Sequence, residues 1–413
     1  MRRLRFLQVT TFYPPYSFGG DGIYVQRLSH ALADEGHQVD VIYCEDSYLL
    51  AAKSPASPPE EHPNVTRHPL RSPLGWLSPL ASHQTGRPYL KRNVLDRLLA
   101  GPPYDVIHFH NISLLGPDVL RLHSPQSIKL YTTHEYWLVC PTHVLLKFGR
   151  ELCEQPQCLK CTLHARRPPQ LWRYTGLLNR AAEHVDQFLS PSRFSARLHA
   201  ERGFPQPIRH LPNFCDRADE DWQNPNPRPH PRPYFLFAGR LEELKGLHTL
   251  IDAWKRVPDF DLLVAGSGNQ EVALRAMSTG NPRVQFLGRL GPSELGRMYA
   301  GATALIVPSL SHEIFALVVV EALARKTPFI ARNLGGLTEL AEDSEAGLLY
   351  QTEDELIEHV RRLGANPALA GEMGARGYQR FLDRWSREAH LRLYAEVLRE
   401  VAMRKFGRIP WHD

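Results

Sequence analysis

Short apolar runs alternate with amphipathic segments along most of the chain. In the first half, six runs are rich in Val, Ile, Leu and Phe, at 5–12, 38–44, 105–110, 128–134, 186–192 and 208–213. Such runs are typical of strands that are buried on both faces. The segment 22–36, between the first two runs, has apolar residues at helical spacing and ends at Gly36. The pattern therefore predicts a parallel sheet with helices on both faces.

A second series of the same kind fills the second half of the chain. We expect strands at 234–240, 260–268, 283–290, 304–310, 327–333 and 346–351, with helical segments between them. The two series are separated by a stretch with five prolines and no periodicity, which indicates a linker. The prediction is an α/β protein with two Rossmann-like domains, whose default ligand site is the cleft between them.

The domain boundaries follow from this reading. The first domain is expected at 1–215, with a Cys-rich insert at 140–161, and the Pro-rich linker at 216–232. The second domain is expected at 233–383, and a C-terminal helix and tail at 384–413. The amphipathic pattern of 386–406 predicts a long helix that packs back on the first domain.

The composition of the chain is that of a globular protein and not of a membrane-spanning or exported one. At 413 residues, with 43% hydrophobic and 23% charged residues, the chain has the profile of a globular protein with two cores. No run approaches the ~18 apolar residues of a membrane span, and the basic N-terminus does not resemble a signal peptide. Six cysteines without an export signal favour a reducing cytoplasm.

The net charge of +5 is concentrated in the first half, where residues 1–200 carry 22 Lys and Arg against 16 Asp and Glu. Between Arg71 and Arg92, Trp76, Tyr89 and several leucines are interleaved with bases. Such a mixture suits a headgroup interface, so peripheral contact with the inner face of a membrane is one expectation. A folded loop over an acceptor groove explains the same segment equally well. Nothing in the sequence points to nucleic acid.

Two cations follow a predicted strand end, and two carboxylates follow another. Arg240 ends the predicted strand at 234–240 and Lys245 follows it, at the place where a doubly wound sheet binds its ligand. Two cations there indicate that the ligand carries a phosphate or diphosphate. Glu313 and Glu321 are separated by seven residues, with Glu321 about one turn into a helix. Carboxylates accept hydrogen bonds from vicinal hydroxyls, so these two residues suit a sugar. A ligand that contains both sugar and phosphate is typically a nucleotide sugar.

These motifs resemble those of the family 4 retaining glycosyltransferases of the GT-B fold, also described as glycosyl transferases group 1. The resemblance rests on the E-x7-E pair, on "GRLEELKG", on "VAGSG" followed by "VQFLGRL", on "LPNFCD", and on the segment 19–41. The motifs occur in the expected order over nearly the whole chain.

The resemblance implies roles for individual residues. Arg240 and Lys245 would hold the donor diphosphate, Glu321 the ribose, and Glu313 the transferred hexose. The remaining residues implied in donor binding are Gly19, Gly20, Gly266, Leu287, Phe315 and Ala316. His134 would lie beneath the reacting sugar. His108 and His110 are interpreted as packing at the end of the sheet, outside the chemistry.

The same resemblance implies retention of configuration without a protein nucleophile and without a cofactor for catalysis. The acceptor would be a glycan, a lipid-linked sugar or a small molecule. Where the family usually has small residues, this chain has Ile314 and Ala316, and the Ala316 methyl is tolerated only if φ stays negative. A GT-B sugar-nucleotide epimerase and a noncatalytic sugar-nucleotide-binding protein remain alternatives.

Four of the six cysteines lie in the insert, at Cys140, Cys153, Cys158 and Cys161. The spacing C-x12-C-x4-C-x2-C is typical of a tetrahedral thiolate site, which predicts structural zinc and, less readily, an iron–sulfur cluster. Four free thiols in a loop are the alternative.

Overall fold

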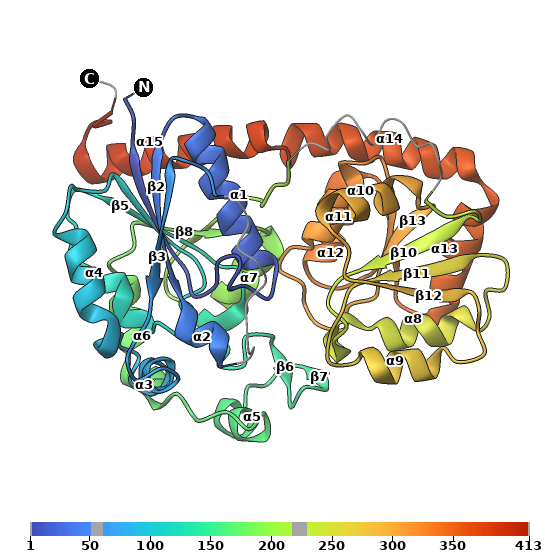
Figure 1. Cartoon of the computed structure of the whole chain (residues 1–413), viewed down its shortest axis with the longest axis horizontal. Coiled ribbons are helices and arrows are strands. Elements are labelled where there is room, and N and C mark those ends of the chain that lie inside the picture. The colour runs from blue at the N-terminus through green and yellow to red at the C-terminus, as the bar shows by residue number, and fades with distance from the viewer. Residues whose placement is uncertain (1, 51–60, 217–228, 412–413) are drawn as a thin grey trace. The chain divides into compact units, whose positions relative to one another are not determined.

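The computed structural model describes residues 2–50, 61–216 and 229–411. The chain forms two compact units; in Figure 1 most of the first is coloured from blue to green, with its C-terminal part in red, and the second runs from yellow to red. The first unit is Met1–Leu211 together with Leu391–Asp413, and the second is Pro212–His390. Most of the predicted linker, namely residues 217–228, lies outside the described residues.

Seven parallel strands form the sheet of the first unit, in the order β3-β2-β1-β4-β5-β8-β9. The direction of this order reverses between β1 and β4, and such a switch point is where doubly wound sheets bind their ligands. The strands are β1 (Arg5–Val9), β2 (Gln38–Cys44), β3 (Val65–Leu70), β4 (Val106–Phe109), β5 (Ile128–Thr132), β8 (Gln187–Ser190) and β9 (Ile208–His210).

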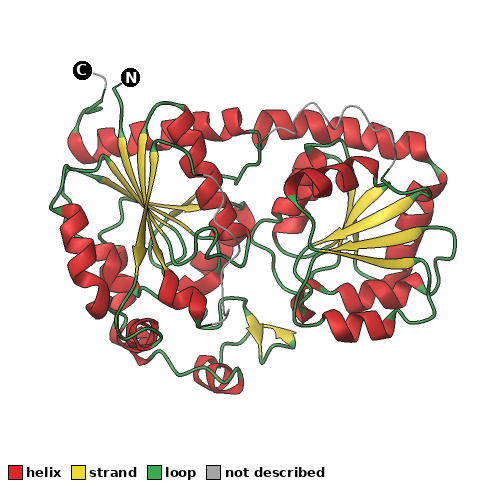
Figure 2. Ribbon diagram, viewed as in Figure 1, coloured by secondary structure: helices red, strands yellow, loops and turns green. Residues whose placement is uncertain are grey.

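Helices connect these strands, and the insert adds a two-stranded antiparallel hairpin (Figure 2). The hairpin consists of β6 (Leu146–Lys147) and β7 (Glu151–Leu152). The α-helices are α1 (Gly20–Asp34), α2 (Glu45–Leu49), α3 (Leu77–Thr85), α4 (Arg92–Leu99), α5 (Cys158–His164), α6 (Leu177–Ala182) and α7 (Arg193–Glu201). Short 3-10 helices are η1 (Tyr89–Lys91), η2 (Pro117–Arg121), η3 (Tyr136–Leu138) and η4 (Leu171–Thr175).

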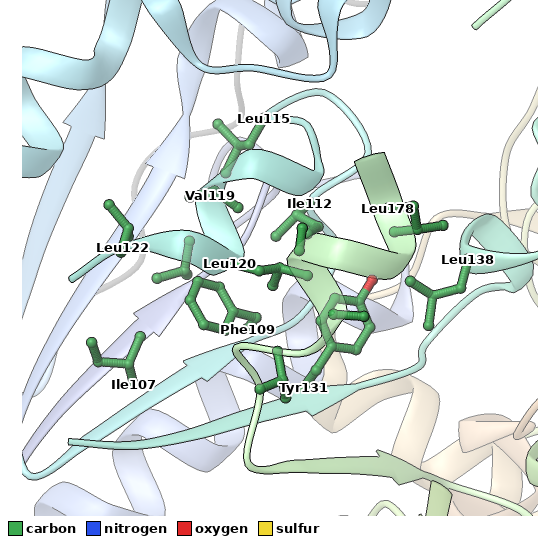
Figure 3. Packing of buried hydrophobic residues seen from close by; sticks show 14 of the residues in the cluster. Ile107, Phe109, Ile112, Leu115, Val119, Leu120, Leu122, Tyr131, Leu138 and Leu178 are labelled. Atoms are coloured by element: carbon green, nitrogen blue, oxygen red, sulfur yellow. The ribbon is translucent and has the colours of Figure 1, made fainter. Parts of the chain in front are cut away.

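One face of this sheet packs on a core of large apolar side chains (Figure 3). Ile107 and Phe109 of β4 project to the same face because alternate residues of a strand do so. They pack with Tyr131 of β5 against Leu120 of η2 and Leu178 of α6, all buried. This packing fixes the strand ends that carry the candidate residues.

The second unit has six parallel strands in the order β12-β11-β10-β13-β14-β15, with the reversal between β10 and β13. The strands are β10 (Tyr234–Ala238), β11 (Asp261–Ala265), β12 (Val284–Gly288), β13 (Ala304–Val307), β14 (Phe329–Arg332) and β15 (Gly347–Tyr350). Its helices are η6 (Glu243–Lys245), α8 (Leu247–Trp254), α9 (Glu271–Met277), α10 (Pro292–Gly301), α11 (Leu317–Leu323), α12 (Gly336–Ser344), α13 (Glu353–Ala365) and α14 (Pro367–Arg384).

Two hydrophobic clusters cover the two faces of the second sheet. Leu236 and Ala238 of β10 belong to one cluster, and Phe235 and Phe237 to the other. A strand buried on both faces needs apolar residues at every position, which is why "YFLFA" shows no alternation.

The last helix, α15 (Arg387–Phe406), begins in the second unit, and from Leu391 onward its residues belong to the first. The Tyr394 hydroxyl lies 3.1 Å from His108 Nδ1, and Lys405 Nζ lies 2.7 Å from a carboxylate oxygen of Asp186. The prediction of two parallel α/β domains, with the C-terminal helix packed on the first, is confirmed.

The sequence reading missed β3. Only Val65 and Leu70 of this strand are buried, and Pro69 interrupts its hydrogen-bonding pattern. An edge strand pairs on one side only and tolerates such residues, so it lacks the apolar run by which the other strands were recognised.

Candidate functional site

In the second unit, the loops that follow β10 and β13 are held together by their backbones. Leu310 N–H donates to Leu244 O at 2.8 Å. Gly246 has φ +70°, and a Cβ there would lie 2.1 Å from the carbonyl oxygen of Pro308. Only glycine fits so close an approach at a positive φ. This contact brings the two predicted motifs to the switch point of the sheet.

Lys245 and Glu313 form an ion pair at this place. Lys245 Nζ donates to Glu313 Oε1 at 2.7 Å, and Ser309 Oγ donates to the same oxygen at 2.6 Å. Burial raises the pKa of Glu313, but the Lys245 charge and both hydrogen bonds outweigh it, so this pKa lies below its ordinary value. The carboxylate is therefore ionised at neutral pH and holds the ammonium in place.

Arg240 follows β10 directly, and its side chain is half exposed. Its Nη1 donates to Glu242 Oε1 at 2.7 Å, and its charge is among those that lower the pKa of Glu313. Arg240 and Lys245 thus lie close to the same carboxylate. Surface pairs such as Arg240–Glu242 contribute little energy, so the guanidinium is available to an anionic ligand.

Glu321 lies in the second turn of α11, half-buried and surrounded by the apolar residues of that helix. Tyr299 donates its hydroxyl to Glu321 Oε2 at 3.3 Å, and Arg325 Nη1 donates to the Glu321 carbonyl at 3.0 Å. A carboxylate in such surroundings needs polar partners, and ribose hydroxyls are of the right type.

The remaining predicted residues of this unit lie at the same edge of the sheet. Gly266 has φ +148°, and a Cβ there would lie 1.8 Å from Gly239 O, which excludes any side chain. Leu287 and Phe315 are partly buried against the core cluster that contains Ala316. Ala316 has φ −90°, so its methyl group is accommodated without strain.

In the first unit, the predicted glycines lie at the start of α1. Gly19 is the N-cap residue, with φ −153°, and Gly20 is the first helical residue. Space near Gly19 is open, with Asp21 Oδ1 3.5 Å from an added Cβ. Asn111, after β4, donates to Asp21 Oδ2 at 3.1 Å. The sequence did not single out Asp21 or Asn111, although they lie within the glycine-rich stretch 19–22 and directly after His110.

His134 follows β5 and is joined to His110, which follows β4. Gln8 Oε1 lies 2.7 Å from His110 Nε2, and His110 Nδ1 lies 3.0 Å from His134 Nε2. Burial lowers the pKa of His110 well below its usual value, and it lowers the pKa of His134 to about 4, with Asp21 acting in the opposite direction. Both rings are therefore neutral at pH 7.

The chain of hydrogen bonds from Gln8 through His110 to His134 determines which ring nitrogen of each histidine carries the proton. An amide oxygen only accepts, so His110 Nε2 must carry a proton, and its Nδ1 is then an acceptor. His134 consequently donates from Nε2 and keeps a lone pair on Nδ1. The interpretation of His110 as packing alone was incomplete, because its ring contacts the His134 ring.

The four cysteines of the insert are near one another. The other thiols are among the groups that raise the pKa of Cys153 and Cys158, after the larger effect of burial. Cys161 Sγ accepts a hydrogen bond from Phe148 N–H at 3.4 Å. However, across the described residues no group of three or more His, Cys, Asp and Glu side chains is arranged to hold a metal ion. The structure therefore does not support the predicted zinc site.

Within the described ranges, no helix has the length and apolar character needed to cross a membrane.

Comparisons with known proteins agree with this architecture. Residues 18–219 match the family model Glycosyltransferase Family 4, and residues 218–380 match Glycosyl transferases group 1. A glycogen synthase of Mycobacterium tuberculosis is 27% identical over 402 residues, which covers 91% of this chain and 90% of that protein.

Two solved structures show the same fold. Sucrose-phosphate synthase from Thermosynechococcus elongatus has a TM-score of 0.74 at 23% identity, over 97% of this chain and 99% of the other. Anabaena HepE in complex with UDP-glucose has a TM-score of 0.67 at 18% identity, over 96% and 99%. These similarities support the GT-B fold, and they leave the roles of individual residues as predictions.

Proposed function

Because this chain belongs to the family 4 glycosyltransferases and therefore transfers a glycosyl group, we propose that its donor is a nucleotide-diphosphate hexose and that transfer proceeds with retention. The acceptor in this proposal is a glycan, a lipid-linked sugar or a small molecule, met by peripheral contact with the inner face of a membrane. HepE binds UDP-glucose, which supports a nucleotide sugar as the donor class.

The observation that carries the donor assignment is the Lys245–Glu313 pair at the switch point of the second sheet. In the proposal, the donor diphosphate takes the ammonium of Lys245 and the guanidinium of Arg240. Two fixed cations neutralise the charge that develops on the leaving diphosphate, so the chemistry needs no added divalent metal. Glu313, released from Lys245, accepts hydrogen bonds from hexose hydroxyls, and Glu321 accepts them from the ribose.

The first unit supplies His134 in this scheme. A neutral imidazole with its lone pair on Nδ1 accepts a hydrogen bond from a sugar hydroxyl and stabilises positive charge at the anomeric carbon. No carboxylate of the first unit is needed as a nucleophile. The leaving diphosphate takes the proton from the acceptor hydroxyl on the same face, and this geometry retains the configuration.

A thermal-shift screen with UDP-, GDP-, ADP- and TDP-sugars identifies the donor, because a specific ligand raises the apparent stability by mass action. Transfer or slow hydrolysis of the selected donor, measured with EDTA present, then tests the metal-free scheme. Glu321→Gln should lower donor turnover about ten- to a hundredfold. Full turnover in this variant would remove Glu321 from the site, and loss of turnover in EDTA would refute metal independence.

We also propose that zinc draws the four cysteines of the insert together. The support is the donor set itself: four cysteines lie within a segment poor in large apolar residues, and neighbouring thiols are among the groups that raise the pKa of Cys153 and Cys158, after the larger effect of burial. The metal would be structural, since four protein ligands leave no open position. Elemental analysis of protein purified without chelator should give about one zinc per chain. Absence of zinc, with unchanged stability in a Cys158→Ser/Cys161→Ser variant, would refute the proposal.

A further inference from the structure

Exposed large apolar side chains gather on one part of the first unit. Of the sixteen found among the described residues, the second unit contributes only Val272 and Met277. Nine belong to the segments 62–95 and 155–182, namely Leu74, Trp76, Leu77, Tyr89, Leu90, Leu159, Leu163, Leu171 and Tyr174. Trp76 is 58% exposed and Tyr174 is 68% exposed, so these rings are not parts of the core.

The same two segments contain no Asp or Glu. Acids make up about one residue in nine of the whole chain, so segments of this combined length would ordinarily hold roughly seven. The bases they carry are Arg67, Arg71, Arg87, Lys91, Arg92, Lys160, Arg166, Arg167, Arg173 and Arg180. We call the exposed side chains of residues 62–95 and 155–182 the acid-free face.

The two segments form one surface. Trp172 Nε1 donates to the carbonyl oxygen of His83 at 2.8 Å, which ties η4 to α3. A Cβ added at Gly86 would lie 2.7 Å from Leu177, so the backbone after α3 packs directly on α6. In Figure 1, α3 and α5 lie at the same end of the first unit.

Four of the acids that border this face are paired, whereas Glu154 and Glu183, which flank the segment 155–182, are exposed. Glu45 and Asp46 of α2 are 3% and 6% exposed, and they pair with Arg71 and Lys91. Asp96 pairs with Arg92 at 3.0 Å, and Glu151 with Lys147 at 3.3 Å. The exposed bases of α5 and of the loop that follows it, Lys160, Arg166 and Arg167, outnumber these two acids, so the surface is positively charged.

We infer that the acid-free face docks the protein on a membrane surface that contains anionic lipids. Trp and Tyr rings are amphipathic and settle at the level of the headgroups, where exposed leucines reach the acyl chains. Arginine and lysine extend from the same surface to lipid phosphates. The inference deepens the proposed function by placing a lipid-linked acceptor within reach. Vesicle binding is measured without donor, so a failure to bind vesicles would leave the donor assignment and the transfer scheme untouched.

The test is co-sedimentation of the full chain with phosphatidylcholine vesicles, alone or mixed with phosphatidylglycerol. Binding should require the anionic lipid and weaken as salt is added. Each base near such a surface contributes about fivefold to partitioning, so Arg166→Gln/Arg167→Gln should bind about 25-fold more weakly. The matched control is Arg361→Gln/Arg362→Gln, which removes two adjacent exposed arginines from α13 of the second unit and should bind like wild type.

Apolar contacts are tested with Trp76→Ser against Val272→Ser, which lies at an 83% exposed position of the second unit. Only the first should weaken vesicle binding, while donor hydrolysis in solution stays at the wild-type rate in both. Equal binding to neutral vesicles, equal loss in the control variants, or no vesicle binding would overturn the inference. Binding to dextran sulfate without binding to vesicles would also overturn it, since the occupant would then be a soluble polyanion.

Discussion

The Lys245–Glu313 pair allows a test in which two neighbouring substitutions have different effects on nucleotide binding. Lys245→Ala removes a charge that the proposal assigns to the donor diphosphate. A charge-assisted hydrogen bond contributes about 1.5–3 kcal/mol, so the Kd for the nucleoside diphosphate should rise about ten- to a hundredfold. Glu313→Gln removes the carboxylate that holds Lys245 at 2.7 Å in the free protein. The ammonium then has no competing anion, so diphosphate affinity should stay within a few-fold of wild type or increase.

Transfer should nevertheless fall in both variants, because Glu313 is assigned to the hexose. The Glu313→Gln variant would therefore bind diphosphate well and transfer poorly, whereas Lys245→Ala would do neither well. Equilibrium dialysis with the nucleoside diphosphate selected by thermal shift measures the first quantity, and donor turnover measures the second. Wild-type diphosphate affinity in Lys245→Ala, or an equal loss of affinity in both variants, would refute the assignment.

The stability of the variants can be bounded from the exposure of the pair. The Lys245 and Glu313 side chains are 31% and 16% exposed. Exposed pairs contribute under about 1 kcal/mol, and breaking a buried pair costs about 3–5 kcal/mol. We therefore expect Lys245→Ala to lower the free energy of unfolding by about 1–2 kcal/mol. Lys255→Ala is the matched control, because its pair with Asp252 at 2.6 Å is 60% and 52% exposed and should cost less.

Three further predictions concern other parts of the chain. Gly246→Ala should lower the free energy of unfolding by about 2–4 kcal/mol in a urea titration, because its φ is +70° and its Cβ would lie 2.1 Å from a carbonyl oxygen. The control Gly280→Ala, at φ +82° with open space around it, should lower it by only about 1 kcal/mol. His390 is fully buried and burial lowers its pKa to about 4, so only the unfolded chain binds its proton between about pH 6.5 and 4. Stability falls with acid over that window, and His390→Asn should reduce the slope by up to about 1.4 kcal/mol per pH unit; an unchanged slope would contradict this. Gln8→Leu removes the acceptor that sets the His110 tautomer, so kcat should fall about tenfold while diphosphate affinity is unchanged, and an unaffected kcat would exclude the hydrogen-bonded chain from a positioning role.

The sequence predicted the strands that contain runs of apolar residues. The segment 38–44 is a strand with the bounds that its Val and Ile run indicates. The strand predicted at 128–134 ends at Thr132, because His134 belongs to the loop. β3 was missed since an edge strand needs burial at few positions.

The contacts between side chains of the candidate site could not be predicted from the sequence. Lys245 and Glu313 are 68 residues apart, and they meet only because β10 and β13 are neighbours in the sheet and Gly246 permits close approach. His110 and His134 are 24 residues apart and meet because β4 pairs with β5. The spacing of residues in the sequence identified the individual motifs, but the order of the strands in each sheet determines which of their side chains meet. The cysteine spacing was interpreted in the same way, and the zinc site that it predicts stays a proposal, because no metal-binding group is arranged among the described residues.

The path of the chain through its two units has a consequence for biosynthesis. The second unit is one continuous piece, Pro212–His390, inserted into a first unit that needs both ends of the chain. Its two boundary residues are joined, since His390 Nδ1 lies 2.8 Å from the carbonyl oxygen of Pro212. On the ribosome, the inserted piece can finish folding first. The contacts of His108 with Tyr394 and of Asp186 with Lys405 can form only after those two later residues have been synthesised. A released chain that is truncated after residue 390 should therefore resist protease in its later-made half and be cleaved in its earlier-made half.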